Sequence, residues 1–570
     1  MAGRNESAAG WIGSESQVSR LRGTVFKATC LGATLLALVL MLVFLLYVVN
    51  DALQPRTADV GWLATYGVTI GLPALALAGY YYRRDTRAGE VAYTSLGLPI
   101  AATVLAGGIT ILFRHLISPQ EWFALVVACA VAIGIIELHG TVHSAGVIDR
   151  LAVVTVVPLL AVVGIPGISV DHTFNTLFLE QELFRIAFST PELAPSLREV
   201  ILSSPVLPTD PHALLLAFTV PVAGAGSLYV RRVRESDRDA ALVGVGAVLA
   251  AGSGLVLAPL AGLSSTAWIV LATVVAVPVG LYVELVVRRG DGVSGLAFPV
   301  VVGLGALLGT VAVGAAGFAG PDTWLTWEFL NNPHSRTPRD AGIYPALVGS
   351  VLMLVVVAVA AFPVGVGAAI YLEEYAPNQG RLGTIVELIE INIANLAGVP
   401  SVVYGVLGLA LFVRTVGMRT GIVLVGGLTI GLLILPIVIV SAQEAIRAVP
   451  DSLREASYGM GATKWQTTRN VVLPRAIPGI MTGTILAFGR AIGETAPLLM
   501  IGAAAVVRLP PESFMGKFSA MPRQIFTWST EIEYEFRYGV LAAGVLTLLV
   551  VLLMMNASAI VVRNKYQRES

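Results

Sequence analysis

Long apolar runs separated by short polar segments dominate this chain from residue 28 almost to its C-terminal end. A helix needs about 20 predominantly apolar residues to cross the hydrocarbon core of a bilayer, and about fourteen runs meet that requirement. Their approximate spans are 28–50, 61–82, 96–116, 121–139, 151–168, 212–230, 240–262, 266–288, 296–318, 344–372, 392–413, 421–441, 478–506 and 538–562. We therefore predict an all-α polytopic membrane protein with about fourteen transmembrane helices.

The amino-acid composition agrees with this pattern. Hydrophobic residues make up 56% of the 570 residues, and charged residues only 13%. A soluble core does not need so much apolar surface, whereas a chain that crosses the bilayer repeatedly does. The formal net charge is zero, so nothing indicates binding to nucleic acid.

The N-terminal leader and the distribution of basic residues predict the orientation. The first apolar run follows a polar leader, residues 1–27. At about 23 residues this run is too long for a signal-peptide core, and no Ala-x-Ala cleavage site follows it, so we expect a membrane anchor. With the N-terminus inside the cell and the spans alternating, about two thirds of the basic residues fall on cytoplasmic segments. We predict a cell-membrane protein with both termini in the cytoplasm.

The loop 169–211 falls outside the cell in this topology. Between Phe174 and Ser204 apolar residues recur every three or four positions. This period predicts an amphipathic helix at the outer membrane surface. A plain extracellular cap is an equally good interpretation.

The cytoplasmic segment 443–477, hereafter the coupling loop, carries the most specific signals. Pro450 ends the helix that leaves the membrane, and Ser452 with Glu455 three residues later forms a capping-box pattern that starts a new one. Gly461 then ends this helix sharply. These signals predict a short helix that lies outside the membrane.

A second short helix is predicted immediately after it. Thr463 and Gln466 have the spacing of another capping box, and Pro474 is expected to close the helix. Two short helices joined at a glycine corner make a compact, rigid element on the cytoplasmic face. We interpret it as a docking element that transmits a mechanical displacement.

The spacing of this loop resembles the EAA signature of ABC-importer permeases, which reads Glu-Ala-Ala, three residues, Gly, nine residues and Ile-x-Leu-Pro. The matching residues are Glu455, Ala456, Ser457, Gly461, Leu473 and Pro474. Ser457 replaces the second alanine and Val471 the isoleucine. The resemblance implies that the loop is the coupling helix, which inserts into a groove of an ATPase subunit.

Further segments are similar to the permeases of the phosphate-specific transport system, PstA type. They are residues 365–377, residues 392–405 and residues 490–499, which read RAIGETAPLL. The resemblance covers roughly residues 340–565, and residues 28–50 resemble the opening helix of the same family. It implies a six-helix type I importer core.

The resemblance implies a division of the chain into four parts. They are a leader at 1–27, a first core helix at 28–60, an additional membrane region of about eight helices at 61–318, and the permease core at 319–570 with coupling loop 443–477. The additional region has no readable function. A lipid-facing scaffold, a docking surface and a second transport unit all remain open.

Ionisable and polar residues at membrane depth are candidates for the translocation pathway. Arg490 and Glu494 stand four residues apart in an apolar stretch, so they share one helix face. Arg490 would offer its guanidinium to a passing oxyanion while Glu494 holds it, or the two form a structural ion pair. Asn392 and Asn395 precede a helix break and either line the pathway or bond a neighbouring helix.

The sequence contains no nucleotide-binding motif that could use ATP to drive transport. A P-loop needs Gly-x4-Gly-Lys-Ser/Thr, and Lys517, which follows a glycine, is followed by Phe518 where the hydroxyl should be. We expect no catalytic residue and no bound cofactor, with ATP and Mg used by a partner ATPase. His139 and His143 have a metal-ligand spacing but lack further ligands, so no metal site is expected.

The family resemblance implies the partners: PstB-type ATPase subunits, a PstC-type permease and an extracellular phosphate-binding protein, within the lipid membrane. Four alternatives stay open. The substrate could be another oxyanion such as molybdate or sulfate, or this chain could be the PstC-type partner. It could also be a secondary transporter, or a membrane scaffold or sensor.

Overall fold

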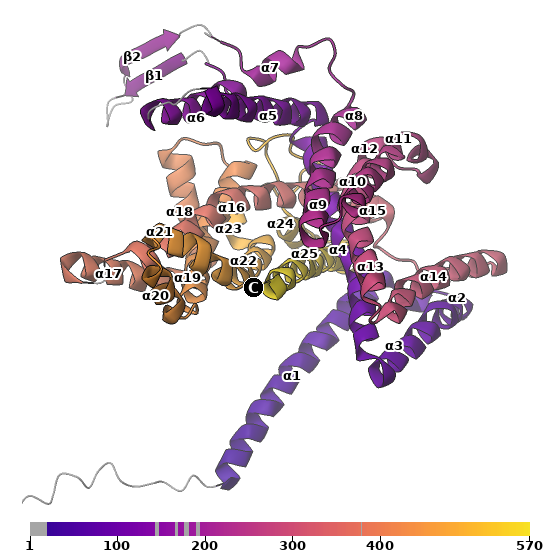
Figure 1. Cartoon of the computed structure of the whole chain (residues 1–570). Helices are drawn as coiled ribbons and strands as arrows, with labels where there is room; N and C mark the ends of the chain where they lie inside the picture. Colours follow the sequence, from indigo (N-terminus) through magenta and orange to yellow (C-terminus); the bar gives the residue numbers. More distant parts are fainter. Residues whose placement is uncertain are drawn as a thin grey trace, which may run out of the picture.

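The computed structural model describes residues 20–142, 147–165, 169–175, 182–189, 194–377 and 379–569. Within them the chain is helical apart from one β-hairpin (Figure 1). The helices of the first part are α1 (Arg20–Leu53), α2 (Val60–Tyr66), α3 (Leu72–Arg84), α4 (Thr86–His115), α5 (Pro119–Val142), α6 (Val147–Val162), α7 (Leu197–Leu202), α8 (Asp210–Leu214), α9 (Val220–Arg234), α10 (Asp237–Gly252), α11 (Gly254–Leu257), α12 (Ser265–Leu271), α13 (Val277–Arg289) and α14 (Ala297–Ala316). Those of the second part are α15 (Trp327–Asn331), α16 (Tyr344–Ile370), α17 (Gly380–Ala397), α18 (Ser401–Gly408), α19 (Val423–Arg447), α20 (Asp451–Gly459), α21 (Lys464–Thr467), α22 (Leu473–Gly493), α23 (Ala496–Met500), α24 (Met521–Ser529) and α25 (Leu541–Glu569).

The number of membrane spans is lower than predicted. Among the described residues, 12 helices are long and apolar enough to cross a bilayer, or up to 13 if the bent pair α17–α18 is one span. The predicted span 151–168 is not among them because α6 ends at Val162, shortly before Gly164 at φ +69°. The chain is thus a multi-pass membrane protein with 12 to 13 candidate spans.

The predicted span 392–413 is a broken helix. The axis bends by 108° between the stretches 380–397 and 401–415. Pro400 lies at the break in an extended conformation with φ −56° and ψ 138°. A proline lacks the N–H that a continuing helix needs and disfavours the helical conformation of the residue before it. The apolar run is therefore continuous in sequence but not in structure.

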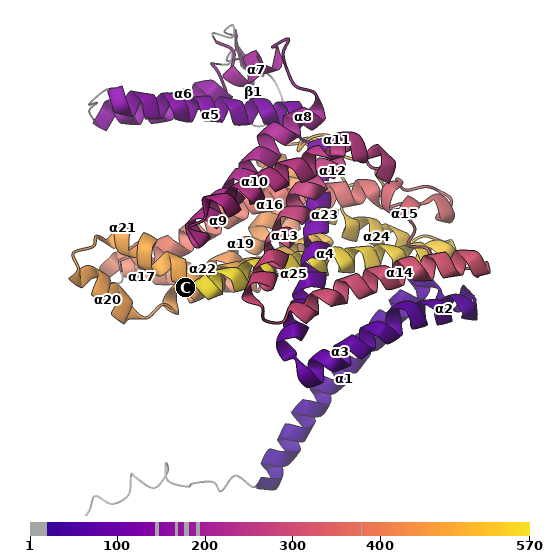
Figure 2. The same cartoon turned by 45° about the vertical axis from the view of Figure 1, so that its right-hand side comes forward.

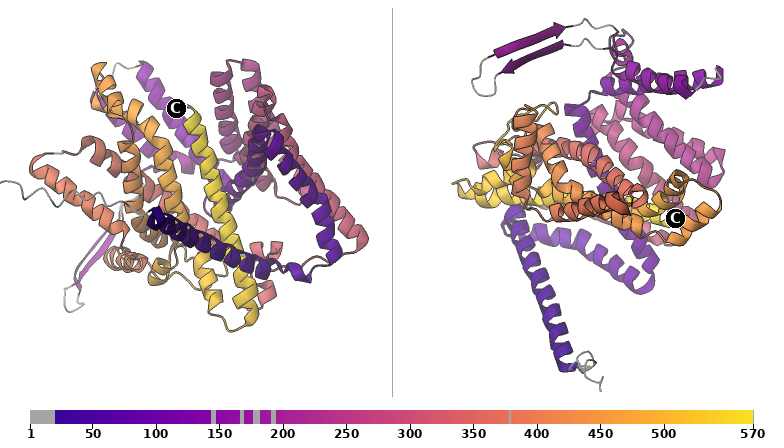
Figure 3. Two further views of the ribbon diagram at one scale, coloured as in Figure 1. Left: turned by 90° about the horizontal axis from the view of Figure 1, so that it is seen from below. Right: turned by 90° about the vertical axis from the view of Figure 1, so that its left-hand side faces the viewer.

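The amphipathic helix predicted between Phe174 and Ser204 is wrong. Strands β1 (Ser169–Asn175) and β2 (Glu182–Ser189) pair antiparallel, with Ser169 opposite Ser189. They are rich in β-branched and aromatic residues, which favour extended backbone. Among the described residues of the predicted stretch only α7 is helical, and the hairpin lies at the periphery beyond α6 (Figures 1 and 3).

Small residues bring the central helices of the C-terminal part into close contact. A Cβ atom on Gly427 of α19 would meet Val356 of α16, and one on Gly365 of α16 would meet Val438 of α19. Small residues at such crossings allow helix backbones to approach, which is the main source of packing energy inside a bilayer. Around these crossings lies the largest buried cluster, to which α16, α19, α22 and α23 contribute.

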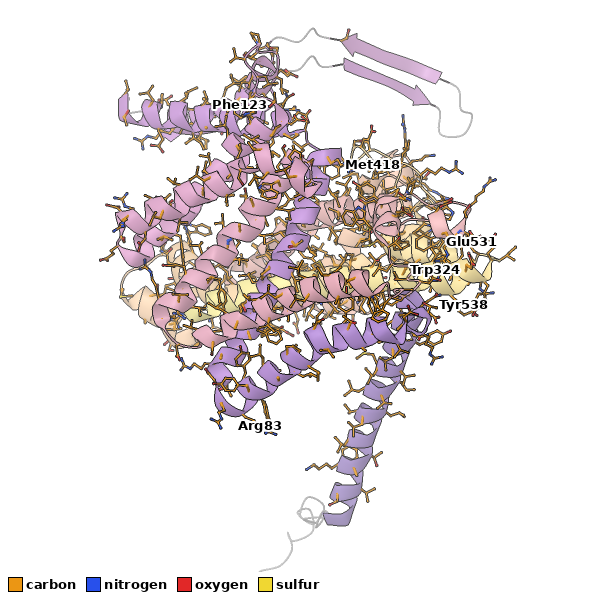
Figure 4. The ribbon with its side chains drawn as sticks, turned by 90° about the vertical axis from the view of Figure 1, so that its right-hand side faces the viewer. Arg83, Phe123, Trp324, Met418, Glu531 and Tyr538 are labelled. Atoms are coloured by element: carbon orange, nitrogen blue, oxygen red, sulfur yellow. The ribbon has the colours of Figure 1, made fainter. Side chains whose placement is uncertain are left out.

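The two ends of the long segment between α1 and α15 lie next to each other. The Asp59 N–H donates to the Ala319 carbonyl at 3.0 Å, and the Ala319 N–H donates to the Asp59 carboxylate at 2.6 Å. Nearby, the Trp324 N–H donates to the Ala52 carbonyl. Trp324 lies at one end of α25, close to Tyr538 (Figure 4). Residues 61–318 therefore begin and end side by side.

Helix α4 connects this extra region to the C-terminal part (Figure 2). It packs along α25 and reaches α16 at its last turn. There His115 Nε2 lies 2.9 Å from the hydroxyl of Tyr344, and the Arg114 guanidinium lies 5.8 Å from the centre of the same ring. The remaining helices of the extra region pack mainly against one another around α4.

A chain that lacks residues 61–318 is still expected to insert into the membrane. The two cut ends already lie in hydrogen-bonding distance, and lipid can replace α4 against α25, since lipid tails are as apolar as the helix they replace. A variant with Val60 joined to Ala319 by a short glycine linker should accumulate in membranes at a level comparable with the full chain. Membrane fractionation checks this expectation, and degradation of the variant would contradict it.

The segment between α15 and α16 carries a histidine, His334, whose contacts lead us to expect that stability depends on pH. The indole N–H of Trp528 donates to Nδ1 of His334 at 3.0 Å, which requires that nitrogen to be unprotonated. Burial lowers the pKa of His334 below 6.5, opposed by Glu531 and assisted by Arg508. The unfolded chain therefore binds a proton more readily than the folded one, so stability falls as pH drops through the unfolded pKa.

Thermal unfolding in detergent should show this loss. We expect a lower melting temperature at about pH 5.5 than at about pH 7.5. In His334→Gln, whose amide oxygen can still accept from the indole, the difference between the two pH values should shrink. An equal difference in both proteins would show that other groups cause it.

Candidate functional site

The coupling loop forms a compact knob at one end of the C-terminal part (Figure 2). Helix α19 ends at Arg447, and the knob, which we define as α20 and α21 with their connection (Asp451–Thr467), follows at once. Gly461 makes the corner between its helices at φ +84°. The chain then returns through α22. The predicted glycine corner and the first short helix are confirmed, whereas α21 is the first turn of the continuous helical span 464–493 and not a separate short helix.

The caps of the two short helices differ from each other. The capping box of Thr463 and Gln466 is confirmed, since each side chain accepts from the backbone N–H of the other residue. The capping box of Ser452 and Glu455 is wrong. Helix α20 begins two residues earlier than that box implies, at Asp451, and Pro450 is its N-cap without a side-chain bond. Because proline already fixes an extended entry, the helix starts directly after it.

Pro474 does not close the second helix, contrary to the prediction. Residues 464–493 form one continuous helical span. Residues Thr468–Val472 adopt a wider π-helical turn immediately before α22. In a regular helix the proline ring would clash with the carbonyl four residues earlier, which here belongs to Asn470 inside that turn. The widened turn moves this carbonyl and lets the helix continue.

The interior of the knob is held by a polar contact, and three large apolar side chains stand exposed on its otherwise polar surface. The Ser457 and Thr467 hydroxyls lie 2.9 Å apart and are buried between the two short helices. Tyr458, Met460 and Trp465 are exposed, Met460 to 84%. Large apolar side chains exposed on a rigid polar element mark a surface that another protein covers.

The other motif residues divide between surface and core. Glu455, Ala456 and Gly461 are exposed on the knob, whereas Ser457 is buried within it. Leu473 and Pro474 open α22, and the neighbouring Val472 is fully buried in a cluster with Ile446 and Val449. Of the six motif residues only Ser457 is buried, whereas Leu473 is half-buried and Pro474 is exposed.

A cluster of glutamates anchors the knob, and the sequence analysis missed it. Glu373 and Glu374 lie in the π-helical turn Tyr371–Tyr375 that ends α16, and Glu390 lies on α17. They meet Gln443 and Arg447 of α19 and Arg454 of α20. Adjacent acidic residues at the end of an apolar helix are the only signal in the sequence. Their partners lie more than 50 residues away along the chain.

The structure brings Arg490 and Glu494 together. Arg490 Nε donates to the Glu494 carboxylate at 3.0 Å, with the side chains 43% and 15% exposed. The pair does not lie in the middle of a helix as predicted, because α22 ends at Gly493 and Glu494 already has an extended backbone. Arg490 is thus in the last turn of the span, beside a break. Its guanidinium keeps donors free beyond the single bond to Glu494.

Asn392 and Asn395 are not joined to this pair. Both lie on α17 and are exposed. The Asn392 amide donates to the carbonyl of Leu388 in its own helix, and the Asn395 carbonyl accepts from the Gly398 N–H where α17 ends. The break in the helix is confirmed. Among the described residues, the Asn392 amide forms its bond within α17 and not with a neighbouring helix.

Metal-ligand sets were sought among the described residues. No group of three or more His, Cys, Asp and Glu side chains within that part could hold a metal ion. His139 lies at the end of α5, and its predicted companion His143 falls outside the described residues.

The chain matches a protein family over its C-terminal part. The family of binding-protein-dependent transport system inner membrane components matches residues 365–565. PstA 1, a phosphate transport system permease of Mycobacterium tuberculosis, is 37% identical over 223 residues, which are 39% of this chain and 70% of that protein. The PstA permease of Xylella fastidiosa is 31% identical over 240 residues, covering 40% of this chain and 77% of its own length.

Other relatives widen the comparison. The PstC permease of Mesorhizobium japonicum is 36% identical over 199 residues, covering 30% of this chain and 58% of its own length. Among solved structures, an inward-facing MetNI methionine ABC transporter aligns with a TM-score of 0.31 at 18% identity, covering 38% of this chain and 93% of that one. The chain belongs to the binding-protein-dependent transport permeases, with PstA-type relatives over its C-terminal region, and is a non-catalytic membrane component of an ABC transporter.

Proposed function

We propose that this chain moves inorganic phosphate into the cell as one permease subunit of an ABC importer. ATP, with Mg, is hydrolysed in a separate PstB-type subunit that docks on the knob. The observation that supports this most strongly is the knob itself, a short helix and the capped start of a long one joined at a glycine corner, with exposed Tyr458, Met460 and Trp465. It lies within the region related to phosphate-transport permeases.

The knob is suited to receive a mechanical displacement from a partner protein. Helices α20 and α21 are joined by a buried hydroxyl pair, and the knob is attached to α19 and α22. It would therefore move as a rigid body with both helices. Aromatic and methionine side chains are typical anchors of protein interfaces. Nucleotide-driven movement of the partner would thereby change the arrangement of the core helices.

Arg490 is the proposed anion contact in the pathway. A guanidinium offers five donors in a planar fork that matches phosphate oxygens. Only one of these donors is bonded to Glu494. Glu494 would hold the fork in place, and the exposure of the pair leaves room for a passing oxyanion. Asn392 and Asn395 stay candidates for the pathway wall because both face outward from α17.

The remaining partners follow from the same proposal. A PstC-type permease would complete the pathway, and an extracellular phosphate-binding protein would deliver the substrate. Helix α1 packs against α25 near its end, through Val48 and Ala52, and is exposed over residues 23–44 (Figure 3). This surface is available to the second permease or to lipid. Both termini would be cytoplasmic, with residues 61–318 an insertion between the first core helix and the core at 319–570.

A second assignment has its own support. The chain is also related to a PstC permease over a shorter region, so the companion role is the runner-up. Another oxyanion such as molybdate or sulfate is the other alternative, because a guanidinium recognises all of them.

Reconstitution in liposomes tests the proposal. The purified chain would be combined with its ATPase, its companion permease and the binding protein. Phosphate-loaded binding protein should stimulate both ATP hydrolysis and phosphate uptake, while the same protein offered sulfate or molybdate should not. Stimulation by another anion alone would overturn the assignment to phosphate, and uptake without any ATPase would overturn the assignment to an ATP-driven importer.

A further inference from the structure

An almost fully buried ion pair joins the knob to the end of α16. The Arg454 guanidinium on α20 contacts Glu374 Oε1 at 3.1 Å through one terminal nitrogen and at 3.3 Å through Nε. The side chains of Arg454 and Glu374 are 15% and 6% exposed. Surface ion pairs contribute little because water screens them, but a buried pair must stay intact once it is formed.

The same guanidinium also ties down the start of the knob. Its terminal nitrogens donate to the carbonyls of Ile446 and Val449, and to the carboxylate of Asp451. Arg454 therefore satisfies the Val449 carbonyl between α19 and α20 and adds a second donor to the Ile446 carbonyl, which also accepts from the Val449 N–H. One side chain connects α19, α20 and the π-helical turn Tyr371–Tyr375.

A second layer of contacts surrounds this pair and is more exposed. Arg447 bridges Glu373 and Glu390, and Gln443 donates to the same two carboxylates. The Lys464 ammonium lies 5.4 Å from the centre of the Tyr375 ring. Arg447 is 57% exposed, so water weakens its contacts more than those of Arg454. The buried pair is the tightest link between the knob and α16.

The position of the glutamates determines which helix a movement of the knob would reach. They do not lie on α19 or α22, the helices that carry the knob; Glu373 and Glu374 lie in the π-helical turn that ends α16, and Glu390 lies within α17. Helix α16 contains Pro363 inside its span and ends in the π-helical turn, both of which are places where a helix can bend. A displacement of the knob would pull on the end of a bendable helix that does not carry it.

We propose that Arg454 and Glu374 are positioning residues that pass movement of the knob to α16, so that ATP hydrolysis and transport stay coupled. This proposal rests on the docking of an ATPase to the knob. Without the pair, the knob would still present its exposed surface to the ATPase, because Tyr458, Met460 and Trp465 do not contribute to the link. Its displacement would no longer reach α16.

The test measures coupling and assembly separately in the reconstituted importer. In Glu374→Gln the ATPase should stay bound and hydrolyse ATP, while the phosphate moved per ATP should fall about tenfold, the size of effect that a coupling contact carries. Asp291→Asn is the matched control, since Asp291 pairs with Arg87 on the surface of the extra region. Its phosphate-to-ATP ratio should equal that of the unaltered chain.

A double-mutant cycle decides whether the pair acts as a unit. Glu374→Gln with Arg454→Gln should lower the ratio no further than either single variant, because one broken link cannot be broken twice. An unchanged ratio in Glu374→Gln would overturn the proposal, as would multiplying effects in the double variant or loss of the ATPase from the complex. Failure of the unaltered chain to bind any ATPase would refute the proposed function instead.

Discussion

Replacing Arg490 with alanine is expected to lower phosphate uptake by about tenfold to a hundredfold, the range that one lost hydrogen bond to a charged group produces. The side chain lies at the end of α22 with one bond to Glu494 and with further donors free. Alanine removes the charge and every donor. The ATPase should stay attached, since the knob lies at the opposite end of the same span. Uptake of labelled phosphate into proteoliposomes measures the effect.

A second variant separates an anion contact from a structural ion pair. If Arg490 and Glu494 only stabilise each other, the double variant Arg490→Ala with Glu494→Ala leaves no unpaired charge and should recover much of the lost uptake. If Arg490 contacts phosphate, the double variant should be as inactive as Arg490→Ala. Arg83→Ala, on an exposed arginine at the end of α3 (Figure 4), is the matched control and should transport normally. Normal uptake by Arg490→Ala would exclude a role in the pathway.

Replacing Gly461 with valine is expected to uncouple ATP hydrolysis from uptake. Gly461 has φ +84°, and nothing lies within 4 Å of the position that a Cβ would occupy, so the penalty is purely one of backbone conformation. A left-handed conformation costs an ordinary residue about 1–2 kcal/mol, and more for a β-branched one. The corner between α20 and α21 would open to relieve it. We expect uptake to fall at least about tenfold, the factor that corresponds to about 1.4 kcal/mol.

Gly262→Val is the matched control for this prediction. Gly262 has φ +68° and equally open surroundings, but it lies in the extra region after α11. Both variants carry the same kind of strain, so both should lose a similar amount of thermal stability. Only Gly461→Val should lose uptake. Equal loss of uptake in both would mean that general destabilisation, and not the shape of the knob, causes the defect.

The knob could be predicted because its signals are local. Gly461 needs only its own backbone conformation, and Thr463 with Gln466 needs only one helical turn. The sequence pattern places the start of α20 two residues late because two start signals, Pro450 and Ser452, lie close together and the proline dominates. Most of the membrane spans were likewise visible as apolar runs, since a bilayer imposes the length of each run directly.

The rest depends on features that no local pattern carries. A hydropathy window averages across Pro400 and cannot detect the 108° bend there. The π-helical turn that accommodates Pro474 widens a helix without changing its composition. Arg454 and Glu374 are 80 residues apart in sequence, and only the packing of α20 against the end of α16 brings them together. The sequence pairs charges that lie one helical turn apart, such as Arg490 and Glu494, but not charges on different helices.

Cross-linking from the tip of the knob tests the central claim most directly. Met460 is 84% exposed there, and a cysteine at this position in a chain with Cys30 and Cys129 replaced by serine would carry a thiol-reactive cross-linker. In native membranes we predict a product that joins position 460 to an ATPase subunit, and none from a cysteine at Ile532, which is 96% exposed on a loop we place outside the cell. If position 460 yields no product with any nucleotide-hydrolysing protein, the knob is not the point at which ATP drives this permease.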